Sequence, residues 1–135
     1  METPYLVPEQ YNILWTSSWM ALFPTLIALN EKQYDLALCS GSVFLSSINY
    51  WKYPINNWCK RLDITVVRMS LMYQLYKCYK TKNVPYLLFS MSGISSYYLG
   101  DYYFRQKKYW IYTYFHFGLH FMGNLGNFAL LKYSK

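Results

Sequence analysis

The sequence predicts an all-α, multi-pass transmembrane helical bundle of about five helices, formed by a single domain over residues 1–135. Only 14% of the residues are charged, against roughly 25% in typical soluble domains, and most charges cluster between apolar runs. Aromatic residues make up 22% of the chain, and Tyr and Trp favour membrane–water interfaces. The mean hydropathy of −0.02 does not exclude a membrane protein, because 17 Tyr residues depress the average.

Five apolar stretches are the candidate membrane spans. They run from about Tyr11 to Asn30, Asp35 to Trp51, Leu62 to Tyr79, Val84 to Gly100 and Tyr109 to Leu131. A span needs about 20 residues, with a range of roughly 17 to 25, so the second and fourth stretches are marginal. Four spans, or a re-entrant second segment, remain alternatives.

The turns and prolines fit these boundaries. Glu31 and Lys32 mark the turn after the first span. Pro24 lies inside that span and predicts a kink, whereas Pro54 and Pro85 fall in a loop and at a helix start, where proline is tolerated. The residues before the first span carry no Lys or Arg, unlike the basic flank of a signal peptide, so we expect this helix to be retained.

The basic charge predicts contact with lipid and no nucleic-acid binding. The net charge is +7, but the basic residues are spread among loops instead of forming one face of a nucleic-acid module. They fit attraction to anionic headgroups of membrane lipid. Six lie on each predicted side of the membrane, so the positive-inside rule gives no orientation. Cys39, Cys59 and Cys78 form neither a disulfide framework nor a zinc-ribbon spacing.

Small and hydroxyl residues concentrate in the second and fourth spans, where they permit close helix approach in lipid. These Ser/Gly-rich helix faces predict packing contacts and offer a route to a homo-oligomer. The residues are Ser40, Gly41, Ser42, Ser46 and Ser47 in the second span, and Ser90, Ser92, Gly93, Ser95 and Ser96 in the fourth.

The only two histidines, His116 and His120, are four residues apart in the fifth span and share one helix face. Neutral imidazole is a common metal ligand, and an ionisable group at membrane depth indicates a functional site. Continued to Gly123 and Asn127, the spacing predicts an interior stripe that faces the second and third spans.

Further polar residues complete the candidate centre. Ser46 or Ser47 lies late in the second span, and Asp63 and Arg68 lie in the third. The five-residue separation makes Asp63 and Arg68 a poor ion pair, so each needs another partner. Asn124 lies one turn beyond His120.

In order and spacing, these residues resemble the CREST superfamily of multi-pass membrane hydrolases, which includes the alkaline ceramidases and the progestin and adipoQ receptors. The matching pieces are Ser47-Ile-Asn-Tyr50-Trp51, Leu62-Asp63 and His116-Phe-Gly-Leu-His120 with its glycine-containing tail. The chain departs from the family in having Trp51 where the first of three zinc-binding histidines is expected, and about five spans instead of seven.

The resemblance implies hydrolysis of an amide bond in a lipid such as ceramide by water activated on zinc. Two histidines and one carboxylate are an accepted zinc ligand set, so our hypothesis is that His116, His120 and Asp63 hold the metal. Asp63 then replaces the missing histidine, and Ser47 supports the site by a hydrogen bond. Ser47 and Asp63 are accordingly the candidate catalytic residues.

Two other functions remain open. In one, Asp63 caps its helix, the histidines bond to neighbouring polar groups, and the protein is a non-catalytic structural membrane component. In the other, the protein is a small channel or transporter in which Arg68 lines a polar path. The short length and aromatic bias suit a compact viral relative. The sequence does not indicate which membrane holds the protein, and the endoplasmic reticulum and a viral membrane are both open.

Overall fold

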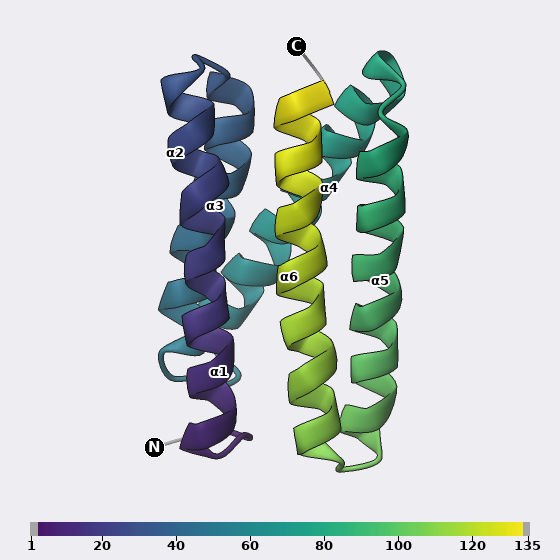
Figure 1. The fold of residues 1–135 in the computed structure, drawn as a ribbon. Helices are drawn as coiled ribbons and strands as arrows, with labels where there is room; N and C mark the ends of the chain where they lie inside the picture. Colours follow the sequence, from purple (N-terminus) through teal and green to yellow (C-terminus); the bar gives the residue numbers. More distant parts are fainter. Residues whose placement is uncertain (1–2, 134–135) are drawn as a thin grey trace.

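The computed structural model describes residues 3–133, which contain helices and no strand. The helices stand side by side with short connections at both ends of the bundle (Figure 1). The elements in chain order are α1 (Pro8–Ser18), the 3₁₀ turn η1 (Trp19–Ala21), α2 (Leu22–Asn30), α3 (Tyr34–Trp51), α4 (Trp58–Thr81), α5 (Val84–Arg105) and α6 (Tyr109–Tyr133).

The first predicted span is one helical segment, Pro8–Asn30, that is distorted in its middle. Pro24 has no N–H to donate to the carbonyl of Met20, four residues earlier. The chain tightens into η1 at this position, between α1 and α2. The kink predicted from Pro24 therefore takes the form of a 3₁₀ turn.

Three of the turns between helices contain a lysine with a positive φ angle. Lys32, Lys82 and Lys107, which lie one or two residues after the ends of α2, α4 and α5, each adopt a left-handed backbone conformation, with φ of 61°, 53° and 59°. At Lys82 the next residue, Asn83, then donates its N–H to the carbonyl of Cys78 at 3.1 Å, which closes the last turn of α4. The short turns place consecutive helices antiparallel.

Side-chain caps fix where α4 and α5 begin. Asn57 accepts a hydrogen bond from the N–H of Cys59 at 3.1 Å, and Asn83 accepts one from the N–H of Tyr86 at 3.0 Å. Pro85 follows Asn83 in the first turn of α5, where the missing N–H costs nothing.

α5 and α6 pack along most of their length through small residues. A Cβ atom added at Gly100 would lie 3.2 Å from Cβ of Phe115, and one at Gly93 would lie 3.6 Å from Leu119. The glycine at position 100 avoids a contact tighter than most Cβ atoms make and so permits this close approach of the two helices. Much of the predicted Ser/Gly-rich surface is thus used inside the chain, and Ser40, Ser46, Ser47, Ser90 and Gly93 are buried.

Two apolar clusters lie toward opposite ends of the bundle. One includes Ala28 and Leu130 and the other includes Leu14 and Trp51. The polar side chains of the candidate site lie beside the second cluster.

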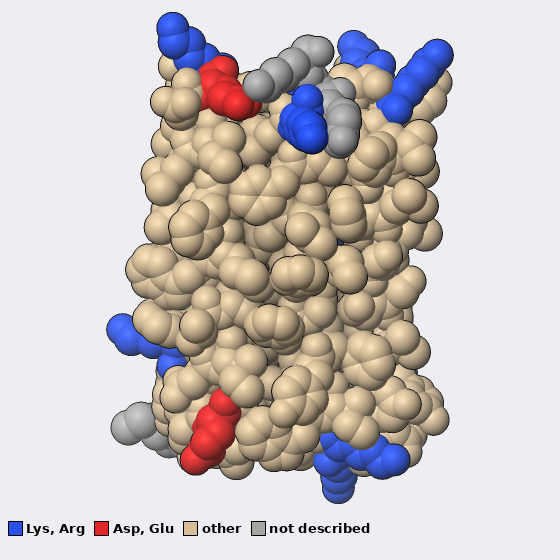
Figure 2. All heavy atoms as spheres, viewed as in Figure 1, with Lys and Arg blue, Asp and Glu red and all other residues tan. Residues whose placement is uncertain are grey.

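One face of the bundle is apolar between two charged ends, whereas Arg68 is exposed near the middle of α4. In the view of Figure 2, Lys, Arg, Asp and Glu gather at the two ends and leave the middle free of charge. Large apolar side chains are exposed on several helices, among them Leu38 on α3 and Met72 on α4, each with 72% of its surface accessible. A soluble monomer rarely exposes so continuous an apolar surface.

Within the described residues, the segment Pro8–Asn30 alone is long and apolar enough to cross a membrane by length and mean hydropathy. Of the five predicted spans, this criterion supports the first. The later helices have 18 to 25 residues, but they are rich in Tyr and carry inward-facing polar residues, both of which lower mean hydropathy.

Candidate functional site

Asp63 and the serines of α3 form a buried hydrogen-bonded group. Ser46 and Ser47 each donate to Oδ1 of Asp63, both at 2.9 Å, and Asp63 is only 8% exposed. The geometry follows from the chain reversal at residues 52–57, which lays the start of α4 against the end of α3. The predicted pairing of Ser47 with Asp63 is therefore present.

His116 and His120 lie on successive turns of α6 with ring centroids 4.9 Å apart. The indole of Trp51, at the end of α3, packs edge to face against His116 at 4.8 Å and against His120 at 6.5 Å. Trp51 is 1% exposed. The two histidines thus share one face, as predicted, and an aromatic ring fills the space beside them.

His120 has a partner that the sequence did not indicate. Its Nδ1 lies 2.6 Å from Oγ of Ser17 in α1, while Ser17 donates to the carbonyl of Leu14 at 3.0 Å. Which of the two atoms donates in the Ser17–His120 contact depends on the tautomer of the imidazole. The histidines of α6 face the second predicted span, α3, as expected, but their other neighbour is α1 instead of the third span, α4.

Tyrosines cover the end of this centre. The hydroxyl groups of Tyr5 and Tyr50 form a hydrogen bond, and the Tyr50 ring lies 4.6 Å from that of Trp51. The Tyr112 ring lies 5.5 Å from that of His116. Tyr5 precedes the first predicted span, and no pattern in the sequence indicates that it lies over the site.

The predicted zinc set requires Asp63, His116 and His120 to converge. Among residues 3–133, no group of three or more His, Cys, Asp or Glu side chains is placed to hold a metal ion. Asp63 accepts hydrogen bonds from two serines, and Trp51 packs against both imidazoles. An indole nitrogen offers a hydrogen and no lone pair, so these residues do not fit the zinc centre expected from the resemblance.

Trp51 carries the one buried side-chain nitrogen or oxygen atom without a hydrogen-bond partner among the described residues, its Nε1. An unpaired buried donor costs about 1–3 kcal/mol. The bundle tolerates this cost at the point where Trp51 contacts both histidines.

The interior stripe of α6 continues through asparagines. Gln74 of α4 donates to Asn127 at 2.8 Å, Asn127 donates to Asn124 at 3.1 Å, and Asn124 donates to the carbonyl of His120 at 2.8 Å. Gly123 was predicted to belong to this stripe but is exposed, because the four-residue step from His120 reaches Asn124.

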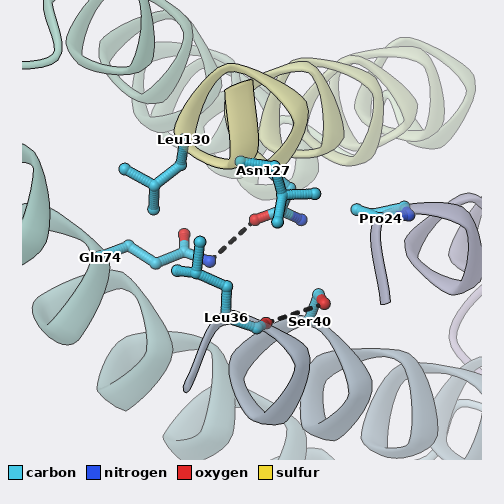
Figure 3. A pocket seen from close by; sticks show the side chains of 7 residues that line it. Pro24, Leu36, Ser40, Gln74, Asn127 and Leu130 are labelled. Atoms are coloured by element: carbon cyan, nitrogen blue, oxygen red, sulfur yellow. Dashed lines mark hydrogen bonds between the residues drawn. The ribbon is translucent and has the colours of Figure 1, made fainter. Parts of the chain in front are cut away.

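Gln74 and Asn127 point toward each other across a narrow gap (Figure 3). The gap leaves no room for a water molecule, so the amides bond directly to each other. The other residues that line it are Pro24, Leu36, Ser40, Leu130 and Leu131.

Arg68 takes no part in the centre. It is exposed on α4, on the side opposite buried Asp63, Ser70 and Gln74, so it does not line an internal path.

No family model, no curated protein and no solved structure matches this chain.

Proposed function

We propose that this chain is a multi-pass integral membrane protein whose helical segments cross the bilayer five times. The shortest of these segments, α3, has 18 residues and the longest, α6, has 25. At about 1.5 Å per residue they measure about 27 and 38 Å, which suits a hydrocarbon core about 30 Å thick. The apolar middle and charged ends of the surface support the same placement (Figure 2).

Exposed aromatic residues mark where the two membrane interfaces would lie. Tyr34 begins α3 and Tyr79 ends α4 at one end of the bundle, where they are 63% and 84% exposed. Trp58 and Trp110 lie near the opposite end. Tyr and Trp prefer the headgroup level, so such belts fix the depth of the bundle in the bilayer.

We also propose that the polar centre stabilises this bundle and performs no hydrolysis. The observation that carries this proposal is the packing of Trp51 against both His116 and His120. The ceramidase-like order of residues then marks a shared architecture in which the position of a zinc-binding histidine has become a packing position. In lipid, buried hydrogen bonds between helices contribute about 0.6 kcal/mol each on average.

The zinc content of the detergent-purified protein tests this proposal. The matched sample is the double variant His116→Ala, His120→Ala. We expect neither protein to hold zinc above the level of a buffer blank. Near-stoichiometric zinc in the unmodified chain that disappears in the double variant would overturn the proposal and favour a zinc-dependent lipid amide hydrolase.

A further inference from the structure

The outer face of α4 has a repeating pattern of residues that no other segment among residues 3–133 covers. Exposed residues recur at alternating intervals of four and three along the whole helix: Trp58, Leu62, Thr65, Met69, Met72, Tyr76 and Tyr79. A period of 3.5 residues is the spacing by which one helix packs along another. The buried residues of α4, including Asp63 and Gln74, lie on its other side.

Arg68 lies directly beside this seam, near the middle of α4. At about 1.5 Å per residue, it is about 15 Å along the axis from Trp58 and about 20 Å from Thr81. It is exposed and forms no ion pair with any residue in the described part of the chain. An arginine at the centre of a membrane helix costs about 2.5–3.5 kcal/mol when nothing pairs with it.

A second copy of this chain does not supply the missing partner. The only carboxylate of α4 is Asp63, which is buried and bound by two serines, so two α4 helices would bring no acid to Arg68. In an antiparallel pair, Arg68 would face its own equivalent. The other described carboxylates, Glu9, Glu31, Asp35 and Asp101, lie near helix ends.

We infer that the outer face of α4 is a docking surface for a transmembrane helix of another protein that carries an Asp or Glu near the middle of the bilayer. The seam supplies the packing contact, and Arg68 supplies the charge that selects the partner. Charged residues that flank a helix–helix seam determine partner choice in this way. This inference rests on the proposed membrane location of the chain.

Synthetic helices in liposomes test the inference on the full-length protein. One is a Leu-rich membrane helix with a single central Glu, the second has Leu at that position, and the third has the Glu moved to its end. Energy transfer between labelled helix and labelled protein reports association. We expect the central-Glu helix to bind about tenfold more tightly than the other two, a difference of about 1.4 kcal/mol.

Two variants of the protein test whether Arg68 causes the preference for the helix with a central Glu. Arg68→Leu keeps the seam apolar and is expected to remove the preference for the central Glu, whereas Arg105→Leu, which changes an exposed arginine at the end of α5, is expected to retain it. An equal preference in Arg68→Leu would overturn the inference. So would efficient cross-linking of two copies through Met69→Cys, because the occupant would then be a second copy.

Failure of the proposed membrane location can be distinguished from failure of the docking surface. A chain that is extracted from liposomes at alkaline pH is not inserted, which would overturn the membrane location and with it the docking surface. An inserted chain without preference for any of the three helices would overturn the docking surface alone.

Discussion

The indole of Trp51 lies edge to face against the imidazole of His116, with 4.8 Å between the ring centroids. This contact joins the end of α3 to the middle of α6 at the most deeply buried tryptophan of the described residues. It fills the space beside both imidazoles with a ring whose nitrogen has no lone pair to offer a metal. The contact therefore supports our proposal of a packing centre.

Replacing that ring should create a metal site. In Trp51→His, a third imidazole would lie beside His116 and His120, and three histidines are an established zinc set. We expect this variant to bind zinc at about one ion per chain, measured by mass spectrometry of the purified protein. Trp51→Phe, which also removes the indole but adds no ligand, should bind none. Equal zinc in the two variants would contradict the geometry described for the centre.

The serine pair should be needed for stability. Ser46→Ala with Ser47→Ala removes both donors to Asp63 and leaves its carboxyl group buried without a partner, at a cost of about 1–3 kcal/mol or more. Ser42→Ala is the control, because that hydroxyl is exposed and bonds to its own helix. The free energy of unfolding of the double variant and of the control is measured in detergent. Equal stability of the double variant and the control would show that the serine–Asp63 bonds contribute nothing.

Gly100 should tolerate no larger side chain. Gly100→Leu would press against Cβ of Phe115, which is 3.2 Å from the position of a first carbon atom, and overpacking costs about 1–3 kcal/mol. Gly123→Leu is the matched change, since a Cβ there meets nothing within 4 Å. We expect a lower melting temperature for the first variant and little change for the second. The reverse order would mean that α5 and α6 do not pack as described.

Lys82 should be better replaced by glycine. Its φ of 53° strains an L-residue by about 1–2 kcal/mol, which glycine avoids. Lys82→Gly is therefore expected to raise the free energy of unfolding by about 1 kcal/mol. Lys80→Gly, inside the last turn of α4, should lower it by about the same amount because glycine weakens a helix interior. A destabilising Lys82→Gly would argue against this turn geometry.

The helices were predictable because charge clusters and prolines bound each apolar stretch. The predicted range from Val84 to Gly100 stops short of the observed end of α5 at Arg105, and the range from Leu62 begins after the observed start of α4 at Trp58. Both errors have one cause. The omitted residues include Asp101 and Lys60, and a helix continues through charged residues once it leaves an apolar region.

The relative position of two residues of the candidate site was predictable where both lie on the same helix. His116 and His120 share a face because residues four apart always do so in a helix. The contact of His120 with Ser17 depends on how α1 packs against α6, and neither local sequence carries that information. The predicted joint ligation of a metal by Asp63 and the histidines depends on helix packing in the same way, and no group of three such side chains is brought together within the described residues.

The positions of the loops relative to the membrane test the central proposal most directly. The turns after α2 and α4 lie at one end of the bundle, and those after α3 and α5 lie at the other (Figure 1). Single cysteines at Lys32, Lys82, Lys52 and Lys107, in a chain whose native cysteines are replaced, should react with an impermeant reagent from opposite sides. We expect the cysteines at Lys32 and Lys82 to react from one side of sealed vesicles, and those at Lys52 and Lys107 to react from the other. Reaction of all four from the same side would contradict a five-span membrane bundle.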